Sequence, residues 1–206
     1  MDAVRDGDGY DAVVLAGGAA RRLGGGTDKP ALQVGGVSLL DRVLAGCAGA
    51  RAVVVVGPER ATARPVVRVS EQPPGGGPVA AVAAALPRVT AGAVLLLAAD
   101  LPFFDTGTAV RLTTALAADP ALDAVVLVDP DGRDQPLAAA YRTGPLRAAL
   151  AALVADHGGD PAGLPLRRLV GGLATCRLED RTGAATDCDT WDDLARARER
   201  ADTRLG

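Results

Sequence analysis

The sequence predicts an α/β fold in which a mostly parallel sheet is covered by helices. Short runs rich in β-branched residues alternate with segments whose apolar residues recur at helical spacing. Strands that alternate with helices in this way favour parallel pairing. The chain has 206 residues, of which 49% are hydrophobic and 23% charged, enough for one domain with a buried core. With no internal repeat and no long linker, we expect residues 1–206 to form a single domain.

The first half of the chain contains four expected strands and two expected helices. Ser38 precedes a helical stripe of apolar residues and is a candidate helix N-cap, because its hydroxyl can accept from a backbone N–H of the first turn. Residues 78–87 are rich in alanine and are expected to be helical. The expected strands are residues 11–17, 51–57, 65–70 and 93–99.

The second half continues the alternation but includes one hairpin. The cluster "DPDGRDQ" (129–135) favours a turn between two extended runs, so an antiparallel excursion is expected there. The C-terminal helix is expected to start at Thr190. The other expected elements are helices at 106–118, about 143–155 and 164–170, and strands at 123–129, 136–142 and near 173–179.

Composition excludes several classes of function. A net charge of −3 and an aromatic content of 2% argue against a nucleic-acid-binding face. Cys47, Cys176 and Cys188 are odd in number and form no CxxC pair, which indicates reduced thiols of a cytoplasmic protein. The N-terminus shows no signal-peptide pattern, and the most apolar run, residues 93–99, is too short to span a bilayer. We therefore expect a cytoplasmic protein without nucleic-acid or membrane partners.

The stretch "VVLAGGAARRLGGGTDKPAL" (13–32) combines many glycines with cations directly after the first expected strand. Such a loop can bind phosphates through its backbone N–H groups. Its glycine spacing matches neither a dinucleotide-binding fingerprint nor a Walker A loop. Two interpretations remain: a triphosphate clamp with Gly17 and Gly18 at the turn and Arg22 and Lys29 as cations, or a surface loop with solvated charges. The position after the first strand favours the clamp.

Five ordered motifs resemble those of one family, the small nucleotidyltransferases of the MobA type, or molybdenum cofactor guanylyltransferases. The first is "LAGGAARRLGGGTDKPAL", similar to the family's LAGG-x-x-x-R-[ML]-G…K signature. The others are "SEQPPGGGPVAAV" (70–82), "LLLAADLPF" (95–103), "GRDQPLAAAYR" (132–142) and "TDCDTWDDLARAR" (186–198). Together they extend over residues 11 to 198. Asp189 replaces the asparagine that is customary in the last motif.

The resemblance implies a Rossmann-like three-layer sandwich of the nucleotidyltransferase type. It implies a Mg²⁺-dependent enzyme that transfers GMP from GTP to a molybdopterin-type cofactor and releases pyrophosphate. Transient contacts with other cofactor-biosynthesis proteins or molybdoenzymes fit the same role. The alternatives are a cytidylyltransferase for the same cofactor, a transferase for another phosphorylated acceptor, and a nucleotide-binding regulator without catalysis. Arg22, Lys29 and Asp100 together argue against the regulator, because a pure binder does not need all three.

The expected site residues follow from the same motifs. Lys29 is expected on the transferring phosphate and Arg22 on the departing pyrophosphate, where each stabilises charge in the transition state. The resemblance implies that backbone groups of Leu15, Ala16 and Gly17 meet the base and ribose. Gln72 occupies the place of an acidic residue near the base in some members. The expected nucleotide-binding set is thus Leu15, Ala16, Gly17, Lys29, Gln72 and Asp100, and the expected catalytic set is Arg22, Lys29 and Asp100.

Asp100 is the expected metal ligand, because it ends an apolar strand at the carboxyl edge of the sheet and carboxylates bind Mg²⁺. The alternative is an aspartate that caps the following turn. Asp187 and Asp189 are candidates for a second ligand, and the alternative for both is an N-cap of the last helix.

Three further groups complete the expectations. The acceptor is expected to face Arg133, Asp134 and Gln135. Arg167 and Arg168 either hold the phosphate of the acceptor or form an ordinary solvated helix face. His157 lies in a polar loop and is expected at the surface.

Overall fold

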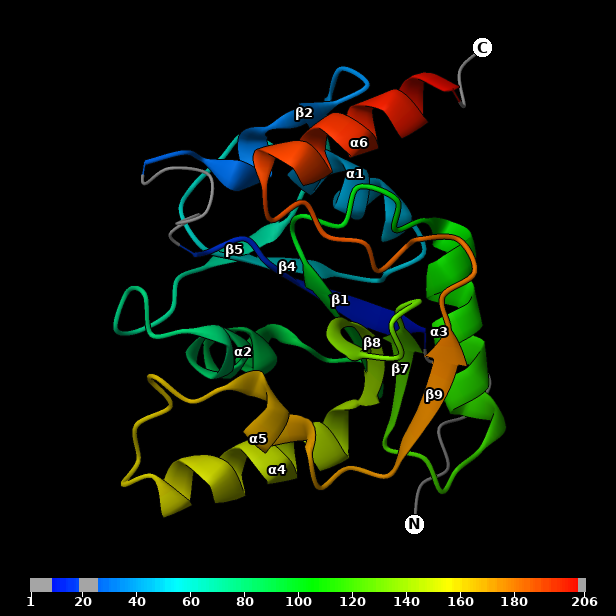
Figure 1. The fold of residues 1–206 in the computed structure, drawn as a ribbon. Helices are drawn as coiled ribbons and strands as arrows, with labels where there is room; N and C mark the ends of the chain where they lie inside the picture. Colours follow the sequence, from blue (N-terminus) through cyan, green and yellow to red (C-terminus); the bar gives the residue numbers. More distant parts are fainter. Residues whose placement is uncertain (1–8, 19–25, 204–206) are drawn as a thin grey trace.

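The computed structural model describes residues 9–18 and 26–203 and confirms the predicted α/β sandwich with a mostly parallel sheet (Figure 1). Seven strands form one sheet, in the spatial order β5 (Val67–Val69), β4 (Val53–Val56), β1 (Tyr10–Leu15), β6 (Ala93–Ala98), β8 (Asp134–Arg142), β7 (Ala124–Val128) and β9 (Thr175–Glu179). The pairs β1–β4, β1–β6, β4–β5 and β7–β9 are parallel. Only β8 runs against its neighbours β6 and β7 within the described sheet.

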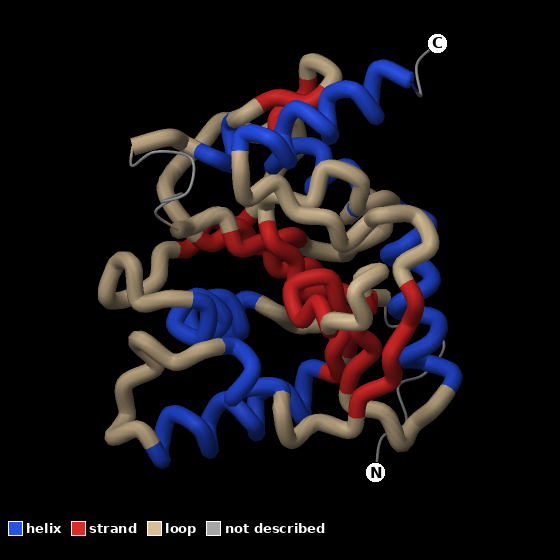
Figure 2. Tube along the Cα trace, viewed as in Figure 1, coloured by secondary structure: helices blue, strands red, loops and turns tan. Residues whose placement is uncertain are grey.

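Helices cover both faces of this sheet because alternate strand residues point to opposite sides. Val14 of β1 packs into the core on one face, whereas its neighbour Val13 packs into the core on the other. Figure 2 shows helices on both sides of the strands. The helices of the first face are α1 (Leu39–Gly46) and α3 (Thr106–Ala118), and those of the second face are α2 (Pro78–Ala85), α4 (Thr143–Asp156) and α5 (Leu166–Val170).

A third apolar cluster joins an early hairpin to the last helix. The hairpin consists of β2 (Gln33–Val34) and β3 (Val37–Ser38), and the helix is α6 (Trp191–Thr203), which lies beside β2 in Figure 1. Val34 and Leu194 are among its buried members. The sequence analysis did not predict this hairpin, which is only two residues long on each side. The described part of the chain also contains two short 3₁₀ turns, η2 (Lys29–Ala31) and η3 (Leu86–Arg88).

Local signals of the sequence are confirmed at several points. The Ser38 hydroxyl accepts from the backbone N–H of Asp41 at 3.0 Å, so Ser38 is the N-cap of α1. The predicted hairpin at 129–135 connects the antiparallel strands β7 and β8. Within residues 9–18 and 26–203, no helix is both long enough and apolar enough to cross a membrane.

The carboxyl ends of three parallel strands lie level with one another. Leu15, the last residue of β1, is the register partner of Val56 in β4 and of Ala98 in β6. In open α/β sheets, this edge is where ligands bind.

Candidate active site

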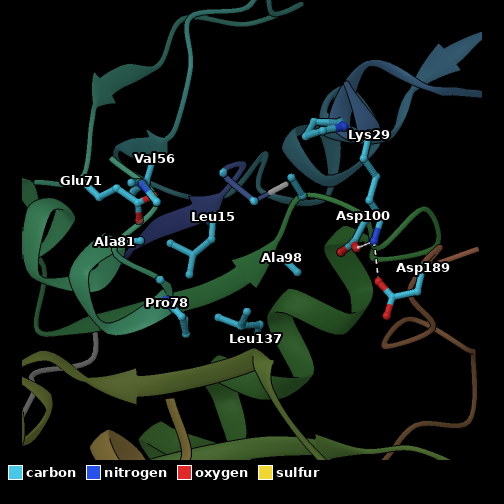
Figure 3. A pocket seen from close by; sticks show the side chains of 16 residues that line it. Leu15, Lys29, Val56, Glu71, Pro78, Ala81, Ala98, Asp100, Leu137 and Asp189 are labelled. Carbon is cyan, nitrogen blue, oxygen red and sulfur yellow. Dashed lines mark hydrogen bonds and ion pairs between the residues drawn. The ribbon is translucent and has the colours of Figure 1, made fainter. Parts of the chain in front are cut away.

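A cavity of about 590 Å³, here called the main cavity, opens at this edge of the sheet. The strand ends Leu15, Val56 and Ala98 line it, as do two glycine-rich segments, one after β1 and one before α2. Among the described residues, its charged lining side chains are Lys29, Glu71, Asp100 and Asp189 (Figure 3).

Three charged side chains meet at one end of the main cavity. The Lys29 ammonium forms an ion pair with Asp100 and donates to Asp189 Oδ1 at 2.6 Å. The side chains of Lys29 and Asp100 are 14% and 16% exposed, and that of Asp189 is 40% exposed. Burial alone would lower the pKa of Lys29, but the charges and hydrogen bonds of the two carboxylates outweigh it and raise this pKa above its ordinary value. Lys29 is therefore a fixed positive charge.

Other side chains take the capping roles that the sequence left open. The α3 helix is capped by Asp105, whose Oδ1 accepts from the N–H of Thr108 at 2.7 Å. In the first turn of α6, the hydroxyl of Thr190 accepts from the N–H of Asp193 at 3.1 Å. The charges of Asp100 and Asp189 face Lys29 instead.

Asp187 lies near the same cluster but points into a different space. It lines a smaller hollow of about 340 Å³, the side pocket, which lies between β8 and α5 and also contacts Gln135 and Leu166. Burial, followed by the charges of Asp189 and Asp100, raises the pKa of Asp187. The buried Cys188 between the two aspartates packs in the hairpin–α6 cluster. Because Cys188 is buried there, the aspartates on either side of it line different spaces, Asp187 the side pocket and Asp189 the main cavity.

Of the three residues whose backbone groups were expected to meet the nucleotide, two line the main cavity and one does not. Leu15 and Gly17 line the main cavity. Ala16 is buried, its N–H donates to the Val56 carbonyl at 2.8 Å, and its carbonyl accepts from Arg60 Nη1 at 2.9 Å. Both backbone groups of Ala16 therefore have partners inside the protein, whereas Gly17 is exposed at the cavity.

Gly57 supports this loop from behind, and the sequence analysis missed it. Its φ is +139°, and a Cβ there would lie 2.8 to 2.9 Å from backbone atoms of Ala16 and Gly17. Any side chain would push the loop into the main cavity. The available signal was a glycine directly after the four-valine strand β4.

Glu71 rather than Gln72 faces the main cavity. The Glu71 carboxylate lines it and accepts from the N–H of Gly75 at 2.9 Å. Gln72 lines a separate pocket with Arg68 and Ser70. Glu71 is the charged residue at the end of the main cavity opposite Lys29 (Figure 3).

The other expected residues are dispersed. Arg22 lies outside the described residues. Gln135 lines the side pocket, whereas Arg133 pairs with Asp131 and Asp134 pairs with Arg177 at the surface. Arg167 and Arg168 are exposed on α5, and the surface position predicted for His157 is confirmed.

Among the described residues, no group of three or more His, Cys, Asp or Glu side chains forms a ready-made metal site. Asp100 and Asp189 are the pair of carboxylates that converge on one cation, the Lys29 ammonium. Protein sites for Mg²⁺ commonly supply only one or two carboxylates and take the remaining ligands from water and substrate phosphates. The donor set therefore fits a metal that arrives with a phosphate ligand.

Comparison with solved structures shows the same architecture. Molybdopterin-guanine dinucleotide biosynthesis protein A from Archaeoglobus fulgidus has a TM-score of 0.71 at 21% identity, over 94% of this chain and 99% of its own. The 2-C-methyl-D-erythritol 4-phosphate cytidylyltransferase of Thermus thermophilus has a TM-score of 0.66 at 24% identity, over 92% and 98%. At these identities the likeness concerns the fold.

Comparison of sequences identifies more similar relatives and the family of the chain. A probable molybdenum cofactor guanylyltransferase from Synechococcus elongatus is 38% identical over 101 residues, which is 45% of this chain and 51% of that protein. A molybdenum cofactor guanylyltransferase from Bradyrhizobium sp. is 36% identical over 117 residues, or 52% and 55%. The chain thus spans about half the length of the curated relatives it matches. Since the model of the MobA-like NTP transferase domain matches residues 12–174, most of the chain, the protein belongs to that family.

Proposed function

We propose that this protein transfers GMP from GTP to a molybdopterin-type cofactor, with Mg²⁺ and with release of pyrophosphate. Membership of the NTP transferase family and the names of its relatives support the reaction class and the acceptor. The observation that carries the proposal is that the main cavity and the side pocket meet at Asp100, which lines both.

Two adjoining hollows suit a transfer reaction better than simple nucleotide binding. The main cavity accommodates the nucleotide, with its phosphates toward Lys29 and its base toward Glu71. The side pocket accommodates the phosphate-bearing end of the acceptor beside Asp100. Placing both substrates at one point replaces a bimolecular encounter by a positioned reaction, which is a large part of the rate gain for such chemistry.

Lys29 stabilises the charge that shifts during the transfer. Its ammonium is already oriented by Asp100 and Asp189, so little reorganisation is needed when phosphate oxygens take over one of these contacts. The Gly18 backbone, exposed at the main cavity, would supply a further donor for the phosphates.

Asp100 and Asp189 would hold Mg²⁺, in agreement with their convergence on a single cation. When bound, Mg²⁺ would neutralise phosphate charge and orient the triphosphate. Asp187 stands apart in the side pocket, where its carboxyl group would orient the acceptor.

Glu71 would select the base. A carboxylate is an acceptor-only group, and guanine presents two adjacent donors, N1–H and N2–H, on its Watson–Crick edge. Adenine and cytosine present a donor beside an acceptor on the same edge, and the acceptor would face a carboxylate oxygen without a hydrogen bond. A site built to hydrogen-bond one base rejects another base strongly when that base leaves the polar groups of the site unpaired.

Turnover tests the proposal directly. Purified protein is incubated with molybdopterin, Mg²⁺ and each of the four NTPs in parallel, and pyrophosphate and the dinucleotide product are measured. We expect product with GTP and none without acceptor. Asp100→Asn serves as the inactive control.

The competing functions give different results in the same experiment. Faster turnover with CTP would assign the cytidylyltransferase activity. Turnover only with another phosphorylated compound would show that the acceptor is that compound and not molybdopterin. Nucleotide binding without turnover in the presence of molybdopterin would contradict catalysis and favour a regulator.

A further inference from the structure

The guanidinium of Arg60 has partners at all three of its nitrogen atoms. Nη1 donates to the Ala16 carbonyl at 2.9 Å and to the Pro58 carbonyl at 3.2 Å. Nε donates to the Asp28 carboxylate at 2.8 and 3.0 Å, and Nη2 lies 2.7 Å from Asp28 Oδ1. Forked contacts of this kind fix orientation as well as distance.

The two main partners of Arg60 stand on either side of the glycine-rich segment. Ala16 comes directly after β1, and Asp28 comes directly before Lys29. Arg60 itself lies in the β4–β5 connection, just after Gly57, whose backbone packs against Ala16 and Gly17. One side chain therefore contacts both Ala16, just after β1, and Asp28, next to Lys29.

We propose that Arg60 is a positioning residue that holds Asp28 beside Ala16 and thereby aims Lys29 at the phosphate end of the main cavity. The proposal rests on the proposed function only in taking Lys29 as the group that meets the phosphates. Arg60 acts through Asp28, the residue next to Lys29, and through Ala16, which sets the start of the segment.

Direct phosphate binding by Arg60 fits the structure less well. Its side chain is 14% exposed, and each of its three nitrogen atoms already has a partner. Arg60 does not line the main cavity. In contrast to a solvated ion pair, it also satisfies a buried backbone carbonyl, that of Ala16.

Arg64 offers a matched control from the same connection. It is half-buried like Arg60 and donates to the carbonyls of Leu44 and Cys47 at 3.3 and 2.8 Å, at the end of α1. Arg64→Ala therefore removes a comparable side chain and two carbonyl contacts but leaves the glycine-rich segment alone. Its effect reports the general cost of losing an arginine from this loop.

Hydrogen exchange measured on the free protein tests this positioning without any substrate. The N–H groups of Ala31 and Leu32 donate to the carbonyls of Asp28 and Lys29 at 3.0 and 3.1 Å, so they report on the turn that carries Lys29. We expect Arg60→Ala to speed their exchange and Arg64→Ala to leave it unchanged. Equal exchange in Arg60→Ala and wild type, or equal acceleration in both variants, would overturn the proposal.

Kinetics then distinguish positioning from stability. We expect Arg60→Ala to lower kcat by about 10²-fold, the scale of a misplacement of about 1 Å, with a smaller change in KM. Arg60→Lys should recover only part of this loss, because an ammonium cannot fork between Asp28 and Ala16. Full recovery by lysine would contradict a role for the forked contacts.

A double-mutant cycle with Lys29 completes the test. If Arg60 acts through Lys29, Arg60→Ala should have little further effect on kcat in a Lys29→Ala background. Additive losses would overturn the proposal. Should no transfer be detectable even in the wild type, the proposed function fails, while the exchange result still decides whether Arg60 holds the turn that carries Lys29.

Discussion

The two ends of the main cavity differ in the charge and polarity of the side chains that line them. Lys29, Asp100 and Asp189 meet at one end through charge, whereas the other end consists of small and aliphatic side chains around the single carboxylate of Glu71 (Figure 3). Under the proposed function, the charged end stabilises the transition state and the apolar end discriminates between bases. Rate and selectivity should therefore respond to different substitutions.

Asp100→Asn should give the largest loss on the charged end. Asparagine keeps the shape and one acceptor oxygen but removes the charge that holds Lys29 and favours Mg²⁺. We expect kcat to fall by about 10³-fold, with partial recovery in Mn²⁺ and an unchanged Tm. Asp105→Asn is the control, because Asp105 caps α3 and asparagine caps equally well. Near-normal turnover of Asp100→Asn at saturating Mg²⁺ would contradict the metal role.

Lys29→Ala should have the next largest effect. The loss of its ammonium removes charge stabilisation at the phosphates, for which a drop in kcat of about 10²-fold is typical. Affinity for the nucleotide should change less. Lys29→Arg, which retains the charge, should keep more of the rate. If steady-state kinetics of Lys29→Ala match the wild type, Lys29 serves only to pair with its carboxylates.

Glu71→Gln should change selectivity at the opposite end. The amide replaces one acceptor by a donor, so guanine loses a hydrogen bond and its advantage over other bases. We expect the ratio of kcat/KM for GTP to that for ATP to fall by about 10-fold to 100-fold, with kcat for GTP less affected. Glu59→Gln makes the same chemical change at an exposed position of the β4–β5 connection and should leave the ratio intact. An unchanged ratio in Glu71→Gln would remove Glu71 from base selection.

Thr190→Ala should have the smallest effect. It removes the hydroxyl that accepts from the Asp193 N–H and so loosens the start of α6, next to Asp189. We expect the free energy of unfolding to fall by about 1 kcal/mol and kcat to fall only a few-fold. Denaturant unfolding measures the first quantity, and Thr190→Ser should restore both. A loss in rate as large as that of Lys29→Ala would indicate that Asp189 matters more than its exposure suggests.

The fold followed from the sequence because its signals are local. The apolar runs of β1, β4 and β6 are buried on both sides, and such strands read as continuous hydrophobic stretches. Ser38 predicted the start of α1 because its own hydroxyl caps the helix. The position of Asp100 at the edge of the sheet was predictable because a single carboxylate follows a long apolar strand.

Side-chain direction in loops was not predictable in the same way. Between β5 and α2, glycines and prolines remove any periodicity, so the sequence could not tell that Glu71 turns toward the main cavity and Gln72 away from it. The choice between Asp187 and Asp189 depended on the burial of Cys188 against α6. Arg60 depends on contacts across the fold that no spacing rule describes.

The bond between Lys29 and Asp189 joins residues 160 positions apart in the chain. Contacts of such separation are slow to form, because the intervening chain must first lose its freedom. We therefore expect the contact between Lys29 and Asp189 to form late, together with the docking of α6 against the β2–β3 hairpin. Nucleotide binding would then report completed folding, and a saturating nucleotide should protect the early hairpin and the late helix from proteolysis together.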